Sequence, residues 1–328
     1  MGYLMSPIDK IRKPIARQLD DFEPFFKESM KSKVPLLDII TNYIYRHKGK
    51  QLRPLLVFLS AGATGSVTQS TYTAAGMIEL LHTATLIHDD VVDESYERRG
   101  AFSINALWRS KIAVLAGDFI LSKGLLLAVE TGEFELLKLM SNAVKEMSEG
   151  ELLQIERSRK MNVDEATYFE IIRMKTATLL ASCAANGAAS SGASKEVVDM
   201  MHEFGTYLGI AFQIRDDLFD YQPKGIIGKP TGNDIKEKKL TLPLIHALSQ
   251  VSERERRRVL KLVRSSRRNG KAVAQVVDFV VSKDGLVYTE KVMQDYKQKA
   301  INVLMRLPQT ACRDSLVLLT NYVVDRNK

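Results

Sequence analysis

Apolar residues recur along this chain three and four positions apart, the spacing of an α-helix, over almost its whole length. Leu37, Ile40 and Ile44 illustrate the pattern, and the stretches that carry it are rich in helix-forming Ala, Leu, Met, Glu and Lys. Clean period-two alternation is absent, and the one tempting strand, Val276–Val281, is short. We therefore expect long helices over residues 68–93, 104–130, 133–159, 164–187 and 195–221.

Glycine and proline, which interrupt helices, are sparse in this chain. The breakers that separate the helical stretches fall at Gly62–Ser66, Gly100, Gly132, Gly187–Gly192 and Pro223–Gly232. No low-complexity linker divides the chain, and no repeat recurs with a period of about 20–50 residues. The sequence therefore predicts one all-α domain over residues 1–328.

Composition is typical of a globular protein in a reducing compartment. Hydrophobic residues make up 45% of the chain, which is enough for a substantial core. The two cysteines, Cys183 and Cys312, lie in apolar helical stretches and are too few for a disulfide framework. No run approaches the roughly 20 apolar residues of a membrane span, and the N-terminus lacks a signal-peptide core. We expect a soluble, cytoplasmic protein.

Positive charge is in excess, with 47 Lys and Arg against 39 Asp and Glu, a formal charge of +8. This excess suits an anionic partner, such as a phosphate-bearing metabolite, a membrane surface or nucleic acid. Many of the cations lie between Glu253 and Lys271, in a segment without interleaved aromatic residues, so we expect no nucleic-acid partner. A solvated helix face is the simplest interpretation of this segment, and attraction to anionic lipid is the next.

Two Asp-Asp-x-x-Asp clusters stand out, each at the end of a long apolar helix: Asp89, Asp90 and Asp93, and Asp216, Asp217 and Asp220. Residues four apart share one helix face with Cβ atoms about 5–6 Å apart, which places like charges together. A cation joining them would remove that cost, and carboxylate oxygens with substrate phosphates are the ligands that Mg²⁺ prefers. A single cluster would most simply be a solvated helix end, but two copies on apolar helices favour metal and phosphate chemistry.

Basic residues near glycine turns complete this pattern, because Lys and Arg side chains bind phosphate oxygens. A glycosidase-like pair of carboxylates would also use acidic residues, but it explains neither these cations nor the duplication. The basic groups are Gly49-Lys50-Gln51-Leu52-Arg53, Arg98-Arg99-Gly100, Lys175-Thr176, Gly228-Lys229-Pro230 and Lys238-Lys239.

Taken in order, these motifs resemble the trans-polyprenyl diphosphate synthase family over roughly residues 35–325. The family commonly has glycine before Gly49 and a basic residue after Lys50, where this sequence has Lys48 and Gln51. The resemblance rests on Gly49-Lys50-x-x-Arg53-Pro54, Glu79-Leu80-Leu81-His82, His88-Asp89-Asp90-x-x-Asp93, Arg98-Arg99-Gly100, Ala116-Gly117-Asp118, Glu149-Gly150-Glu151, Lys175-Thr176-Ala177 and Gly209-x-Ala211-Phe212-Gln213-x-x-Asp216-Asp217-x-x-Asp220.

The resemblance implies antiparallel helices around a deep central cavity, the isoprenoid synthase fold, with the two aspartate motifs facing each other across its mouth. It implies three Mg²⁺ ions per active site, held mainly by Asp89, Asp93 and Asp216, with Asp90, Asp217 and Asp220 ligating directly or through water. Isopentenyl diphosphate would contact Lys50, Arg53, His82 and Arg99. The allylic diphosphate would contact Arg98, Lys175, Thr176, Gln213, Lys229 and Lys239.

The expected reaction joins these two diphosphates head to tail in the trans configuration, and a homodimer is expected. The growing chain would run past Leu81, Ala84 and Thr85, of which Ala84 and Thr85 lie about one turn from the metal ligands. Short-chain relatives have bulky aromatic residues before the first aspartate motif, whereas Ala84 and Thr85 are small. We therefore expect a long-chain product for a quinone side chain, with peripheral membrane contact at product release.

Several alternatives stay open at this point. The nearest is a short-chain geranylgeranyl or farnesyl diphosphate synthase. A terpene cyclase would share the aspartates but would not need Lys50, Arg53 and Arg99 for a second diphosphate. A catalytically silent regulatory subunit would be expected to lose aspartates, and all six are present. A basic membrane- or nucleic-acid-binding protein would rest on the positive charge alone.

Overall fold

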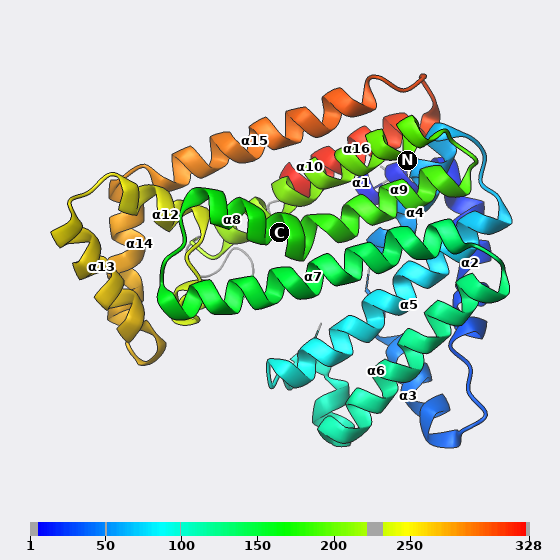
Figure 1. Ribbon diagram of the computed structural model, residues 1–328, viewed down its shortest axis with the longest axis horizontal. Coiled ribbons are helices and arrows are strands. Elements are labelled where there is room, and N and C mark those ends of the chain that lie inside the picture. The colour runs from blue at the N-terminus through cyan, green and yellow to red at the C-terminus, as the bar shows by residue number, and fades with distance from the viewer. Residues whose placement is uncertain (1–5, 50, 99, 222–231, 326–328) are drawn as a thin grey trace, which may run out of the picture. The chain divides into compact units, whose positions relative to one another are not determined.

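The computed structural model describes residues 6–49, 51–98, 100–221 and 232–325, and Arg268 by its backbone alone. Helices form almost all of the regular structure in these ranges (Figure 1). The two strands there, β1 (Glu97–Arg98) and β2 (Ala101–Phe102), pair antiparallel with Glu97 opposite Phe102 and Arg98 opposite Ala101. The predicted all-α fold class is therefore confirmed.

The chain forms two compact units. Unit 1 comprises Met1–Ser141, Ser182–His202 and Leu307–Leu316, and unit 2 comprises Asn142–Ala181, Glu203–Arg306 and Val317–Lys328. Unit boundaries fall inside the helices α7 (Phe134–Lys160), α9 (Thr178–Ser190), α10 (Lys195–Phe219) and α16 (Ala311–Asp325). The expectation of one domain over residues 1–328 stays a prediction.

Aromatic side chains fill part of the core of unit 1. Phe22 stacks on Phe26 at a centroid distance of 5.6 Å, and Phe58 meets Phe22 and Tyr72 edge-on at 5.6 and 5.0 Å. These rings join α2, α4 and α5 in one buried cluster, and such pairs add to the energy of burial itself. The elements wholly in unit 1 are α1 (Pro7–Arg12), η1 (Lys13–Ile15), α2 (Ala16–Ser29), α3 (Pro35–Arg46), α4 (Leu52–Thr64), α5 (Gln69–Val92), β1, β2 and α6 (Ile104–Glu130).

Helices α5 and α6 lie side by side in unit 1 (Figure 1). Two glycines of α6 permit this close approach: a Cβ at Gly117 would lie 2.6 Å from His88 Cδ2, and one at Gly124 would lie 3.4 Å from Leu80 Cβ. His88 precedes the first aspartate motif directly, so the fit between the two helices fixes where that motif emerges.

The core of unit 2 brings together apolar side chains from helices distant in sequence. Ile214 of α10, Leu244 of α12 and Val276 of α14 are fully buried in one cluster. The elements wholly in unit 2 are α8 (Glu165–Ile172), the π-helical turn η2 (Arg173–Ala177), α11 (Asn233–Lys236), α12 (Leu242–Ser249), α13 (Glu253–Ser265), η3 (Ser266–Arg268), α14 (Gly270–Ser282) and α15 (Gly285–Leu304).

The hydropathy pattern located the long helices well. The expected helices over 68–93, 104–130 and 133–159 correspond to α5, α6 and α7, which differ from them by at most one residue at either end. Helix α6 is interrupted near its start, where the backbone of Arg109 is non-helical with a φ of 65°. The stretch 164–187 forms α8, η2 and α9, and the stretch 195–221 forms α10. The tempting strand at Val276–Val281 is part of α14.

Helix α6 departs from the expectation about membrane spans. By length and composition it could cross a membrane, and 33% of its most apolar window is buried. We expected no segment with the length and apolar composition of a membrane span. By length and composition, that expectation was wrong for α6. Cys183, which is buried, and Cys312 are both free thiols, as predicted.

Candidate active site

The first aspartate cluster lies at the C-terminal end of α5. Asp89 and Asp93 are exposed, whereas Asp90 between them is only 2% exposed. The Asp93 N–H donates to the Asp89 carbonyl at 2.8 Å, so the helical register continues through the motif. The two exposed carboxylates are therefore one helical turn apart, as the sequence predicted, and Asp90 has a different role.

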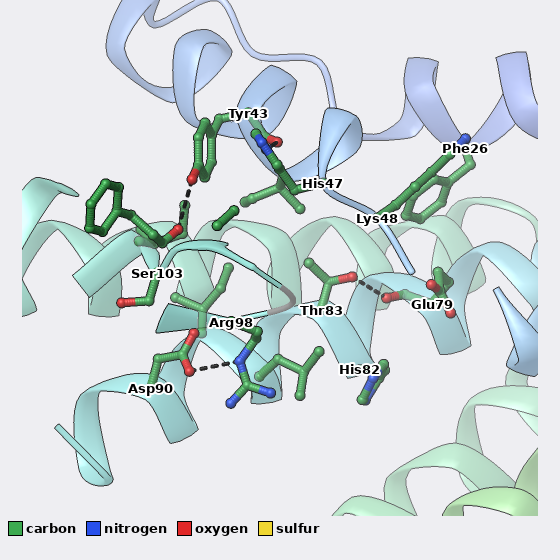
Figure 2. A pocket seen from close by; sticks show the side chains of 16 residues that line it. Phe26, Tyr43, His47, Lys48, Glu79, His82, Thr83, Asp90, Arg98 and Ser103 are labelled. Carbon is green, nitrogen blue, oxygen red and sulfur yellow. Dashed lines mark hydrogen bonds and ion pairs between the residues drawn. The ribbon is translucent and has the colours of Figure 1, made fainter. Parts of the chain in front are cut away.

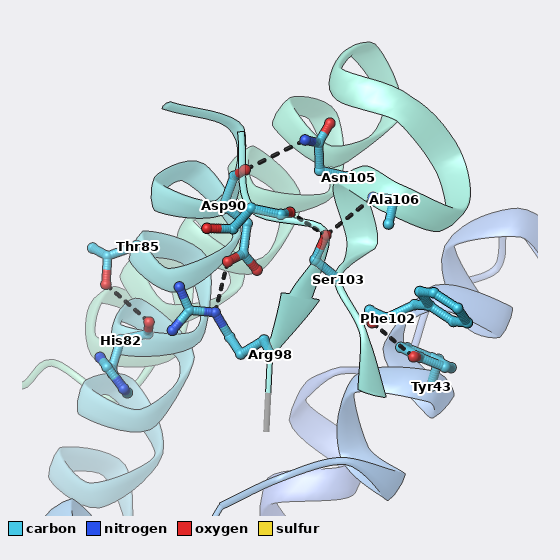
Figure 3. A network of polar contacts seen from close by, with 10 residues as sticks. Tyr43, His82, Thr85, Asp90, Arg98, Phe102, Ser103, Asn105 and Ala106 are labelled. Atoms are coloured by element: carbon cyan, nitrogen blue, oxygen red, sulfur yellow. Dashed lines mark hydrogen bonds and ion pairs between the residues drawn. The ribbon is translucent and has the colours of Figure 1, made fainter. Parts of the chain in front are cut away.

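Asp90 forms an ion pair with Arg98 of β1. Arg98 Nε donates to Asp90 Oδ1 at 2.7 Å, and Figure 3 shows the guanidinium turned toward the carboxylate. Burial raises the pKa of Asp90, and the contact with Arg98 opposes that rise. Arg98, expected to contact the allylic diphosphate, therefore also anchors the first aspartate cluster.

A network of hydrogen bonds fixes the hairpin that carries Arg98 (Figure 3). Asn105 Nδ2 donates to the Asp90 carbonyl at 3.3 Å, and Ser103 Oγ donates to the Ser95 carbonyl at 2.7 Å. The same Ser103 Oγ accepts from the Ala106 N–H and caps α6. Arg99, the next predicted ligand along this hairpin, lies outside the described residues, as does Lys50.

A pocket in unit 1 adjoins this network. Figure 2 shows Tyr43, His47 and Lys48 on one side of it, with His82 and Asp90 of α5 and the Arg98 side chain on the other. Lys48 pairs with Glu23, and its ammonium lies 4.2 Å from the centre of the Tyr45 ring. Thus Lys48, which departs from the family pattern, adds a cation to the pocket that contains His82.

The predicted chain-length residues lie on α5 below the first cluster. Leu81 and Ala84 are 2% and 1% exposed, and Thr85 is half-buried, with its hydroxyl donating to the His82 carbonyl at 2.8 Å. Ala84 lies four residues after Leu80 and four residues before His88, about one helical turn from each, so it shares the α5 face that meets α6.

The second aspartate cluster, in unit 2, is more buried than the first. Asp217 accepts hydrogen bonds from Tyr168 Oη at 2.7 Å and Gln213 Nε2 at 2.8 Å. Burial, with the nearby charge of Asp234, raises the pKa of Asp217 to about 8. Asp216 is partly exposed beside it.

Asp220 caps the short helix α11. Its carboxylate accepts from the Asn233 and Asp234 N–H groups at 2.9 and 3.0 Å. Burial, then the charge of Asp220, raises the pKa of Asp234 to about 6. Asp234 is thus a fourth carboxylate of this cluster, and sequence reasoning missed it.

One pocket of unit 2 gathers several predicted phosphate-binding residues around Asp217. Thr176 Oγ1 donates to Gln213 Oε1 at 2.8 Å, and the other end of the Gln213 amide donates to Asp217. Lys175 Nζ donates to Gln154 Oε1 at 2.7 Å and pairs with Glu151, and Lys239 pairs with Glu237 at 2.6 Å. Lys175, Thr176, Gln213 and Lys239 all line this pocket, as do Asp217 and Asp234. Lys229 lies outside the described residues.

A π-helical turn, η2, presents Lys175 and Thr176 to this pocket. Such turns occur mostly as insertions in α-helices and are frequent at functional sites. Two glycines make room for it: a Cβ at Gly150 would lie 2.7 Å from Met174 Cβ, and one at Gly209 would lie 2.7 Å from Ala177 Cβ. This packing explains why the motifs Glu149-Gly150-Glu151 and Gly209-x-Ala211 belong with Lys175-Thr176.

The donor set of each cluster suits a hard divalent cation. Asp234 and Asp216 both raise the pKa of Asp217, so these carboxylates repel one another, and a bound cation would relieve that repulsion. Within the described residues, no three His, Cys, Asp or Glu side chains form one ready ligand set. Mg²⁺ is commonly held by one or two carboxylates, with substrate phosphates and water as the other ligands.

The family model for polyprenyl synthetases matches residues 34–280, which include both aspartate clusters and, except for Phe26, the residues that line both pockets. The chain belongs to the polyprenyl synthetase family. The octaprenyl diphosphate synthase of Escherichia coli (strain K12) is 33% identical over 323 residues, covering 98% of this chain and 99% of that protein.

Solved structures agree with this assignment. A polyprenyl synthase from Caulobacter crescentus CB15, complexed with calcium and isoprenyl diphosphate, has a TM-score of 0.88 at 30% identity and covers 100% of both chains. A geranylgeranyl pyrophosphate synthase from Bacteroides thetaiotaomicron has a TM-score of 0.83 at 36% identity and covers 98% of this chain and 100% of that chain. The expected isoprenoid synthase fold is therefore confirmed. The mutual orientation of the two aspartate clusters stays a prediction.

Proposed function

We propose that this protein condenses isopentenyl diphosphate with an allylic diphosphate, head to tail and in trans, to make a long-chain polyprenyl diphosphate. The observation that carries the proposal is the pocket of unit 2. It brings Lys175, Thr176 and Gln213 beside Asp217, so cations, neutral donors and carboxylates meet in one place. Such a set suits a diphosphate accompanied by metal ions.

In this mechanism the allylic C–O bond breaks, and its electron pair leaves with the diphosphate. Lys175 and the Thr176 hydroxyl stabilise the charge that develops on the leaving group. The double bond of isopentenyl diphosphate, held by Arg53 and His82, attacks the allylic carbon. The released diphosphate then takes the proton that restores a double bond, so no covalent protein nucleophile is required.

Mg²⁺ is the proposed metal, three ions per active site, and its chemistry is neutralisation of the leaving diphosphate. Asp89, Asp93 and Asp216 would be its principal ligands. Asp90 and Asp217, both buried and hydrogen-bonded, would orient their clusters or ligate through water. The Caulobacter polyprenyl synthase is complexed with calcium and isoprenyl diphosphate, which supports the use of a divalent cation.

We also propose that the product is a long-chain polyprenyl diphosphate that supplies the side chain of a quinone. Small residues at 84 and 85 and the octaprenyl specificity named for the Escherichia coli relative support product length. The alternative is a short-chain geranylgeranyl or farnesyl diphosphate synthase, favoured by the likeness to the Bacteroides geranylgeranyl enzyme. Chromatography of the dephosphorylated product, made by purified protein from labelled isopentenyl diphosphate and Mg²⁺, decides between them.

We further propose a cytoplasmic homodimer with peripheral membrane contact at product release. Support for the dimer comes from α6, whose exposed large apolar side chains form more apolar surface than a solvated helix ordinarily leaves uncovered. They are Leu107, Val114, Leu115, Leu125, Leu126 and Val129, each 38–57% exposed. Support for the membrane contact comes from the product, whose hydrocarbon chain is insoluble in water.

A further inference from the structure

Almost all of the net charge of this protein resides in one short segment. Residues 253–271 hold nine Lys and Arg against two Glu, a formal charge of +7 out of +8 for the whole chain. The remainder of the protein is therefore nearly neutral. A concentrated field of this kind acts on a partner locally, within about 10 Å at ordinary ionic strength.

Helix α13 arranges these cations on one face. Arg254, Arg257, Arg258, Lys261 and Arg264 recur at helical spacings of three and four, and all five are exposed. We call them the basic face of α13. On the opposite side, Val259 and Val263 are buried in the core of unit 2. The helix lies beside α14 (Figure 1), so its orientation is fixed by packing before any partner binds.

Few acidic side chains neutralise the positive charges of the basic face. Arg257 pairs with Glu253 at 3.0 Å, with both side chains largely exposed. In the part of the chain that the structure describes, Arg254, Arg258, Lys261 and Arg264 have no ion-pair partner. Like charges one helical turn apart repel one another, so this face costs stability in isolation. An anionic partner would remove that cost.

We propose that the basic face of α13 docks the protein on a bilayer rich in anionic phospholipid. A flat anionic surface can meet all five cations at once, because they lie on one side of a straight helix. Nucleic acid is the less suitable polyanion, since residues 253–271 contain no aromatic side chain on which bases could stack. The inference rests on the proposed function in one respect: a polyprenyl product must pass from the protein into a membrane.

The test is binding of the full-length protein to vesicles, without substrates. Wild-type protein should co-sediment with vesicles of phosphatidylcholine containing about 30% phosphatidylglycerol, but not with phosphatidylcholine alone, and binding should fall in about 0.5 M salt. The triple variant Arg254→Gln, Arg258→Gln, Lys261→Gln should bind the anionic vesicles on the order of 100-fold more weakly.

The matched control removes three charges elsewhere. Lys138, Lys291 and Lys299 are exposed, and the variant Lys138→Gln, Lys291→Gln, Lys299→Gln should bind nearly as wild type. Equal loss in both triple variants, or none in the α13 variant, overturns the proposal. So does tighter binding of wild type to polyuridylate than to anionic vesicles at equal salt.

Condensation activity, assayed in detergent without lipid, separates this inference from the proposed function. The α13 triple variant should keep its turnover there, because none of its residues lines either pocket, and its melting temperature should not fall, because the substitutions relieve repulsion between like charges. Loss of vesicle binding with intact turnover supports the docking surface. A wild-type protein that binds anionic vesicles but makes no product would instead overturn the proposed function alone.

Discussion

At the scale of single residues, the six motif aspartates range from exposed to buried, with Asp216 and Asp220 partly exposed. Asp89 and Asp93 are exposed, whereas Asp90 and Asp217 are buried and hydrogen-bonded to Arg98 and to Tyr168. The Asp-Asp-x-x-Asp spacing predicted which aspartates share a face, because helical geometry alone determines it. It could not predict the pairs Arg98–Asp90 and Tyr168–Asp217, since the first depends on the β1–β2 hairpin folding back on α5 and the second on the packing of α8 against α10.

We expect Asp89→Ala and Asp216→Ala each to lower kcat by orders of magnitude, because the charge on the leaving diphosphate loses a metal ligand. Steady-state turnover with saturating substrates and Mg²⁺ measures this. Asp278→Ala is the matched control, since Asp278 is an exposed aspartate of α14 and lines neither pocket. Near-normal turnover in both cluster variants would contradict the metal assignment.

The two diphosphates should be separable by mutation. Lys50→Ala and Arg53→Ala should each raise the KM for isopentenyl diphosphate about 10- to 100-fold, the loss of a charge-assisted contact of roughly 1.5–3 kcal/mol. The KM for the allylic primer should change less. Lys175→Ala should give the opposite pattern, and an interchange of the two patterns would show that the subsites have been assigned the wrong way round.

At the scale of elements, the long helices were predictable and the short departures from them were not. The stretch 164–187 has continuous helical periodicity, yet the structure inserts the π-helical turn η2 at Arg173–Ala177. A single wide turn barely changes the apolar spacing, so no pattern reveals it. The β1–β2 hairpin was not predicted either, because two-residue strands are too short to show an alternation of apolar and polar residues.

The glycine packed against η2 offers a test of that turn. Gly209→Ala would place its Cβ 2.7 Å from Ala177 Cβ, so the turn or α10 must shift. We expect a destabilisation of about 1–3 kcal/mol, seen as a lower Tm, and a higher KM for the allylic primer because Lys175 and Thr176 move. Gly270→Ala is the control, since a Cβ there meets nothing within 4 Å. Unchanged Tm and KM in Gly209→Ala would show that η2 tolerates the displacement.

At the scale of the whole molecule, the exposed apolar side chains of α6 predict a homodimer. Light scattering at micromolar concentration should give twice the chain mass. Leu115→Glu with Leu126→Glu should produce monomers, because each places a charge where an apolar interface would exclude water. Val287→Glu, at an exposed position on α15, should leave the dimer intact. A fully active wild-type monomer would refute the dimer proposal.

Product length is also a property of the whole molecule, and Ala84 tests it. Ala84 is 1% exposed and lies five residues before Asp89, about 7.5 Å along the helix axis from that predicted metal ligand. A prenyl chain anchored at the metals must pass this level early. Interiors are close-packed, so a ring at position 84 would fill the path or press against α6, where Gly117 already meets His88.

Ala84→Phe should therefore shorten the product toward C15–C20 while the first condensations proceed, because the diphosphate contacts are untouched. Its Tm should also fall, since overpacking a core costs about 1–3 kcal/mol. Thr85→Phe is the comparison, because Thr85 is half-buried and points to a different side of α5. Thin-layer chromatography of the dephosphorylated products measures the product length of both variants. If Ala84→Phe lowers Tm but keeps the wild-type product length, the bulk at position 84 is accommodated by α6 rather than by the product path. The case for a long-chain enzyme would then rest on Thr85 and the relatives.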